Sequence, residues 1–162
     1  MRSRAASRGD AEAVARIYNE GIEERVATFE TRQRTAGEIR GWFDDGLPIV
    51  VVEDDGTVVS FANASAYSTR ECYSGVAEFS VYTADGARGR GAGTLAVEAL
   101  ISASEEAGFW KLTSRVFVEN ESSRRLLLSL GFREVGVHEK HARLDGVWRD
   151  VVVVERLIPA NL

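Results

Sequence analysis

The chain has few of the residues that mark disulfide-rich, disordered or membrane-spanning proteins. Among its 162 residues there is one cysteine, Cys72, so an internal disulfide or a zinc site built from several cysteines is excluded. Two prolines and no low-complexity run argue against disorder. The longest apolar runs, Ile49–Val52 and Val151–Val154, are far shorter than the roughly 20 residues of a membrane-spanning helix. Residues 1–10 carry positive charge without a following apolar segment, so we expect no secretory signal peptide, no membrane partner and a cytoplasmic location.

Positive charge is also scarce. Lys and Arg number 20 against 25 Asp and Glu, which gives a net charge of -5 and disfavours a nucleic-acid partner. All but two of the basic residues are arginines. Because arginine keeps its charge and binds oxyanions through two parallel N–H donors, arginines next to glycines are the informative ones.

Length and composition predict one α/β domain over residues 1–162. Asp10 is expected to cap the first helix, and Thr35 with Glu38 forms a capping-box pattern at the second. The pattern predicts strands near 2–6, 49–53, 57–66, 76–83, 109–118, 133–144 and 147–157. It predicts helices near 10–25, 35–45 and 92–107, and a fourth that begins at Asn120 or Ser122 and ends at Gly131. Hairpins first and a strand–helix–strand crossover in the middle favour a mixed sheet.

Glycine is concentrated between the strand near 76–83 and the helix near 92–107. The segment Arg88–Gly93 brackets two arginines with small residues directly before that helix. Free N–H groups at the helix start, the helix dipole and the charges of Arg88 and Arg90 together suit a phosphate or pyrophosphate.

Three other interpretations of this segment are weaker. Gly91–Ala96 matches the dinucleotide pattern G-x-G-x-x-A, but the preceding strand ends about eight residues earlier and no repeated strand–helix–strand unit follows. No Gly-Lys-Ser/Thr follows, so it is not a P-loop. The remaining alternative is a flexible glycine loop.

The order of motifs resembles the GNAT superfamily of N-acetyltransferases. Arg88–Gly93 fits the family's pyrophosphate loop, Q/R-x-x-G-x-G/A, and Asn120–Ser123 fits its N-x-x-S motif. Leu126 and Gly131-Phe132 follow in the family's order, and the agreement covers about residues 2–158. The resemblance implies a mixed, mostly antiparallel sheet of six to seven strands, flanked by four helices and splayed between strands 4 and 5. It also implies acetyl-CoA as co-substrate, with no metal.

The resemblance also assigns the acetyl-CoA contacts. Backbone groups near Val81 and Tyr82 are expected to hold the pantetheine arm and polarise the thioester carbonyl. Asn120 and Ser123 are expected to line that arm, although both could simply cap the helix. The pyrophosphate is expected to be held by Arg88, Gly89, Arg90, Gly91, Ala92, Gly93 and Thr94.

Further residues resemble the branch that acetylates phosphinothricin and methionine sulfoximine, which implies a small amino-acid-like amine as acceptor and a homodimer. They are Tyr18-Asn19, Thr28-Phe29, Arg70, Tyr73, Ala77-Glu78, Val81-Tyr82, Gly146, Trp148 and Asp150. In that branch the glutamate that corresponds to Glu78 is the general base, and the arginine that corresponds to Arg70 holds the acidic groups of the substrate. The strand pattern puts Glu78 opposite Phe79 and Val81, where it could accept a proton directly or through water.

Each acceptor-side residue has a plainer alternative. Glu78 could be a salt-bridged surface residue, Arg70 a solvated arginine, Tyr73 an aromatic anchor of its loop and Phe29 a core residue. Leu127 stands where many relatives carry a tyrosine and this branch a histidine as acid for the leaving thiolate. Water, another residue such as Tyr73, or direct loss of thiolate would then complete the reaction.

Other acceptors and two other sites stay open. The acceptor could be an aminoglycoside, a polyamine or a protein N-terminus, or the chain could bind coenzyme A without catalysis. His138 and His141 should point to opposite faces of their strand, so we expect no metal site there. Cys72 as an acyl-carrying nucleophile lacks an evident base.

Overall fold

The computed structural model describes all 162 residues and contains one seven-stranded sheet. Its strands are β1 (Arg2–Ala5), β2 (Ile49–Asp54), β3 (Thr57–Ala66), β4 (Val76–Thr83), β5 (Lys111–Phe117), β6 (Arg133–Leu144) and β7 (Val147–Leu157). The order across the sheet is β1-β2-β3-β4-β5-β7-β6, and every neighbouring pair is antiparallel except β4 with β5. The predicted mixed, mostly antiparallel sheet is therefore present.

Four helices cover the sheet: α1 (Ala11–Glu24), α2 (Ala36–Trp42), α3 (Ala92–Glu106) and α4 (Glu121–Ser129). Side chains of α1 and α2 pack on one face of β2 and β3, against Val51 and Phe61. Residues of α3 and α4 join a larger core on the opposite face, around Val52, Leu112 and Val154. The run Ile49–Val52 is buried throughout because helices cover both faces of β2. No helix combines the length and the apolar character that crossing a membrane requires.

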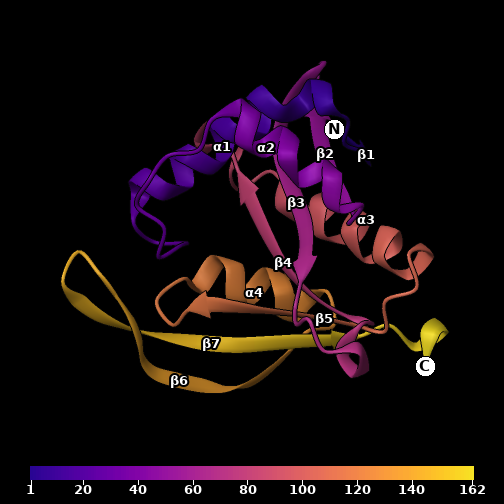
Figure 1. Cartoon of the computed structure of the whole chain (residues 1–162). Coiled ribbons are helices and arrows are strands. Elements are labelled where there is room, and N and C mark those ends of the chain that lie inside the picture. The colour runs from indigo at the N-terminus through magenta and orange to yellow at the C-terminus, as the bar shows by residue number, and fades with distance from the viewer.

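The sheet opens between β4 and β5. Their parallel pairing covers only Val76–Glu78 against Lys111–Thr113. Beyond Glu78 the strands diverge, and Figure 1 shows β3 and β4 running in a different direction from β5, β6 and β7. This is the predicted splay between strands 4 and 5.

The helix caps differ in part from the sequence prediction. The Asn120 carboxamide oxygen accepts a hydrogen bond from Ser123 N (3.3 Å), so Asn120 caps α4. Thr35 Oγ1 accepts from Glu38 N (3.2 Å), as expected for α2. Asp10 occupies the predicted N-cap position of α1 but makes no capping hydrogen bond, because its carboxylate instead binds Arg4 (2.8 Å) and the backbone N–H of Ser7 (2.8 Å).

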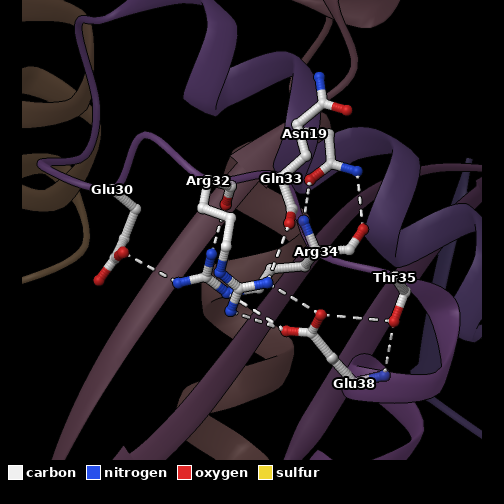
Figure 2. Close-up of polar contacts among 7 residues, drawn as sticks. All are labelled: Asn19, Glu30, Arg32, Gln33, Arg34, Thr35 and Glu38. Carbon is white, nitrogen blue, oxygen red and sulfur yellow. Dashed lines mark hydrogen bonds and ion pairs between the residues drawn. The ribbon is translucent and has the colours of Figure 1, made fainter.

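The loop between α1 and α2 is pinned by a polar network (Figure 2). Asn19 holds the backbone of Arg34 at both polar groups, with its Oδ1 accepting from Arg34 N (2.8 Å) and its Nδ2 donating to Arg34 O (2.9 Å). The Arg34 guanidinium binds Glu30 (2.9 Å), while Glu38 binds Arg32 (3.0 Å). These contacts fix residues 27–30 beside the opening of the sheet, where they line a cavity.

Candidate functional site

Backbone groups of β4 lie unpaired in the opening. Ala84 N donates to Val59 O (2.8 Å), which sets the phase of the antiparallel β3–β4 ladder. By that alternation the backbone of Tyr82 bonds to Phe61 on β3, while the N–H and C=O of Phe79 and Val81 face β5. Phe79 O accepts from Ser114 Oγ (2.8 Å), and Val81 has no partner because the β4–β5 pairing has ended.

The Val81 groups fit a ligand that carries amide and carbonyl groups. Backbone polar groups away from water are normally paired, so a free N–H and C=O in the opening suit the pantetheine arm and thioester of acetyl-CoA. The prediction that Tyr82 contributes backbone donors is wrong, since β3 occupies them. Tyr82 instead lines the opening with its ring, and burial raises the pKa of its hydroxyl.

Three neighbouring cavities lead through the opening. The first, of about 390 Å³, is lined by Phe29, Glu78 and Arg115 among others. The second, of about 50 Å³, lies between β4 and α4 and shares Tyr82 and Arg115 with the first. The third, of about 330 Å³, lies at the start of α3 and shares Val81 and Ser123 with the second. Because each cavity shares lining residues with the next, the three lie in a row through the opening, and together we call them the path.

The third cavity has the backbone features of an anion site. Gly89 and Gly91 have φ of 74° and 88°, a conformation that favours glycine. Gly91 caps α3, and the first helical bond runs from Leu95 N to Gly91 O (3.1 Å), so the N–H groups of 92–94 remain free. The wall includes Ala92, Gly93 and Thr94. This is the arrangement that a pyrophosphate needs.

The two arginines of this loop are not equivalent. Arg88 lines the third cavity, and its guanidinium binds Glu24 (2.6 Å) and the carbonyl of Thr83 (3.3 Å). Arg90 binds Asp54 (2.7 Å) and is absent from the cavity wall. The expectation that both arginines face one anion therefore does not match this arrangement, because an acidic residue on β2 draws Arg90 away.

Glu78 is the last residue of β4 that pairs with β5, and it lines the first cavity. Its Oε1 accepts from Arg115 Nη2 on β5 (3.1 Å). Glu78 therefore forms the ion pair that the plainer alternative predicted, and it also lines the cavity. Sequence reasoning missed Arg115, which lies in a strand that also contains Lys111, Thr113 and Ser114 and so gave no distinctive signal.

Arg115 also contacts His141, with Nη1 and Nε2 3.3 Å apart. The prediction that His138 and His141 point to opposite faces is wrong, since their ring centroids are 4.7 Å apart. A register shift between His138 and Ala142, with Lys140 at a φ of 46°, breaks the alternation. Burial, with smaller contributions from His138 and Arg115, lowers the pKa of His141. No group of three or more His, Cys, Asp or Glu side chains is arranged to hold a metal ion.

The other predicted residues lie at different distances from Glu78. Phe29 lines the first cavity and packs edge-on against Phe117 (4.7 Å between centroids), so its wall and core roles coincide. Tyr73 lines a further cavity of about 320 Å³ that shares Glu78 and Arg115 with the first. Arg70 is exposed, lies over the Tyr73 ring (5.7 Å) and lines neither cavity.

Leu127 is buried and lines the second cavity, where it offers no proton. Asn120 and Ser123 line the same cavity, so their capping role and a place along the path coincide.

Comparison with known proteins decides the family. Residues 14–132 match the acetyltransferase (GNAT) family model. The chain belongs to this family. It is 30% identical over 154 residues to phosphinothricin N-acetyltransferase from Streptomyces coelicolor, covering 91% of this chain and 90% of that one. The resemblance to the phosphinothricin acetyltransferase-like branch is confirmed, and the protein is an N-acetyltransferase.

Solved structures confirm the GNAT fold. A phosphinothricin acetyltransferase from Sinorhizobium meliloti, in complex with acetyl-CoA, superposes with a TM-score of 0.90 at 29% identity and covers 96% of this chain and 87% of that one. A ribosomal-protein-alanine N-acetyltransferase from Brucella melitensis gives 0.93 at 28% identity, covering 98% and 100%. The two neighbours share the fold while their names give different acceptors.

The Arg115–His141 contact generates the first prediction. Arg115→Gln should raise the pKa of His141, because a nearby positive charge that disfavours the imidazolium is lost. The pKa should remain below its ordinary value, because burial and His138 still lower it. An NMR titration of the His141 ring protons measures this, with Arg40→Gln on the exposed side of α2 as control. An unchanged pKa in Arg115→Gln would contradict the contact.

Proposed function

We propose that the protein transfers the acetyl group of acetyl-CoA to the amine of a small amino-acid-like acceptor of phosphinothricin or methionine sulfoximine type. The acceptor attacks directly in a ternary complex. One observation carries this proposal: Glu78 faces a cavity on one side of the sheet opening, while the unpaired Val81 backbone and the Gly89–Thr94 loop lie along the path to the other side.

On the donor side, the backbone does most of the binding. The free N–H groups at the start of α3 and the Arg88 guanidinium hold the pyrophosphate. Val81 N–H and C=O hold the pantetheine arm, and the N–H stabilises negative charge on the thioester oxygen as the amine attacks. Asn120 and Ser123 line the arm between these two contacts.

On the acceptor side, Glu78 manages the proton. An α-amine with a pKa of about 8 is largely protonated at neutral pH, and only the neutral amine attacks a carbonyl carbon. The bound ammonium first gives one proton to Glu78, directly or through water, which leaves a neutral nitrogen. That nitrogen bonds to the thioester carbon, the C–S bond breaks, and the nitrogen loses its second proton to water. Leu127 offers no acid, so the departing thiolate takes its proton from water.

The first cavity favours a small acceptor, since about 390 Å³ lies in the range of small-molecule sites. A protein N-terminus is the second candidate, because the Brucella neighbour is named for such a substrate. Aminoglycosides, polyamines and a non-catalytic role complete the alternatives.

Thiol release from acetyl-CoA separates these candidates, with phosphinothricin, methionine sulfoximine, methionine sulfone, spermidine, an aminoglycoside and an alanine-initiated peptide as acceptors. Turnover with spermidine or the peptide alone would contradict the proposal, and acetyl-CoA binding without any thiol release would indicate the non-catalytic role.

Glu78→Gln should lower kcat about 100-fold at neutral pH, because general base catalysis is lost while the side chain keeps its size. The loss should shrink as pH rises, because solvent then deprotonates the amine. Thiol release measured across pH tests this, with Glu12→Gln on the exposed face of α1 as control. A pH profile identical to that of the unsubstituted protein would remove Glu78 from the mechanism.

Arg88→Ala should weaken acetyl-CoA binding roughly tenfold or more, because a charged hydrogen-bond donor of the third cavity is lost. Arg90→Ala should change the affinity little, because Asp54 holds that guanidinium away from the cavity. Calorimetric titration with acetyl-CoA compares the two, and each serves as control for the other. Equal losses would show that Arg90 leaves Asp54 to bind the pyrophosphate.

We also propose that the protein is a homodimer through its last two strands. Strand β6 is the sheet edge and is exposed along most of its length, and it carries Val135 and Val137 at 46% and 52% exposure. The unpaired N–H and C=O groups of an exposed edge strand can pair with another chain. Trp148 and Val147 on β7 extend the apolar surface.

Sedimentation velocity should give a species of twice the 17.8 kDa chain. Val137→Glu should yield the monomer, because a carboxylate would be buried in the interface. Val26→Glu, at an equally exposed valine in the α1–α2 loop, should leave the dimer intact. A monomer for the unsubstituted chain would refute the proposal.

A further inference from the structure

Arg115 occupies the middle of the acceptor face. It lies on β5 just beyond the last residue paired with β4, and its side chain is 48% exposed. The first cavity and the further cavity near Tyr73 lie on either side of it, and both are lined by Glu78, Ser114 and Arg115. Any acceptor whose amine reaches Glu78 therefore lies against Arg115.

The Arg115 guanidinium has donors to spare. A guanidinium carries five N–H donors, and the structure gives Arg115 two side-chain partners, Glu78 Oε1 (3.1 Å) and His141 Nε2 (3.3 Å). The neutral His141 ring, which its lowered pKa favours, can accept a hydrogen bond at Nε2 when the proton is on Nδ1, and this contact would orient the guanidinium. No other lysine or arginine lines the first cavity.

We infer that Arg115 binds the carboxylate of the acceptor and selects α-amino acids over other amines; this rests on the proposed function. The amine and carboxylate of an α-amino acid are joined through one carbon, and the Glu78 carboxylate and the Arg115 guanidinium are in contact. The bound acceptor replaces this internal ion pair with two: its carboxylate on Arg115 and its amine at Glu78. Each charge keeps a partner, which limits the cost of removing it from water.

Arg70 is poorly placed for this task. It precedes a short turn at Glu71–Tyr73, and its guanidinium lies over the Tyr73 ring outside both cavities. An acceptor carboxylate at Arg70 would leave the remaining N–H donors of Arg115 unused, although Arg115 lines both cavities and Arg70 lines neither. The structure therefore assigns the carboxylate to Arg115, not to the arginine that the sequence resemblance indicated.

The test compares one acceptor, methionine sulfone, with its carboxamide, which keeps the amine and removes the negative charge. The unsubstituted protein should prefer the free acid in kcat/KM. Arg115→Ala should lose that preference by tenfold or more, mainly through KM, because kcat/KM should fall much further for the acid than for the amide. Arg115→Lys should restore part of it, because lysine supplies the charge without the two parallel donors. Arg40→Ala is the matched control.

Two outcomes would overturn the inference. Equal losses for acid and amide in Arg115→Ala would show that Arg115 only positions Glu78. Loss of the preference in Arg70→Ala, with its retention in Arg115→Ala, would return the carboxylate to Arg70.

Calorimetric titration of the same acid and amide into the coenzyme A-bound protein gives this comparison without turnover. Acid binding that disappears in Arg115→Ala supports the inference even if no acetyl transfer occurs, which would refute the proposed function alone. Equal affinity of the unsubstituted protein for acid and amide refutes the inference.

Discussion

Three residue pairs between β4 and β5 join two antiparallel half-sheets, and the site depends on where that parallel pairing stops. Trp110 N bonds to Gly75 O (2.8 Å) at the start of the junction, and Ser114 Oγ bonds to Phe79 O (2.8 Å) just beyond it. Beyond that point β4 is no longer hydrogen-bonded to β5, so the backbone N–H and C=O of Val81 have no strand partner. Glu78, at the end of the pairing, lies beside Arg115. If the parallel pairing of β4 with β5 continued to Val81, the backbone of Val81 would be bonded to β5 and the opening would close. The free Val81 backbone and the Glu78–Arg115 pair therefore both follow from the short parallel pairing of β4 with β5.

The arginines at the site are held by carboxylates from other elements. Arg88 binds Glu24 of α1, Arg90 binds Asp54 of β2 and Arg115 binds Glu78 of β4. Arg88 and Arg115 line the proposed binding cavities, whereas Arg90 does not. Because partly exposed ion pairs contribute little stability, an incoming anion can replace the carboxylate at Arg88 or Arg115 at small net cost. The proposed ligands, a pyrophosphate and an amino-acid carboxylate, are such anions, and their binding would be compatible with a net charge of -5.

The sequence predicted the elements that local patterns control. The β6–β7 hairpin has the expected bounds, because both strands flank Asp145-Gly146, and the glycine loop precedes α3 as predicted. It did not predict Arg115, since the partner of Glu78 depends on the β4–β5 register between segments more than 30 residues apart. It placed His141 on the wrong face of β6 because a bulge interrupts the two-residue alternation of side chains between His138 and Ala142. It overrated Arg70 because a match of residue type fixes no side-chain direction in a loop.

Leu127 links these observations to the direction of proton transfer. It is buried and apolar and lines the smallest of the three neighbouring cavities, so it offers no proton there. The ionisable side chains that line the first cavity beside the proposed acceptor include Glu78, Arg115 and His141. The donor side holds backbone amides, glycines, Leu127 and the Arg88 guanidinium, and none of these has to exchange a proton in the proposed reaction. The proposed mechanism therefore separates two tasks across the sheet: backbone groups would polarise the thioester on one side, and charged side chains would select and deprotonate the amine on the other.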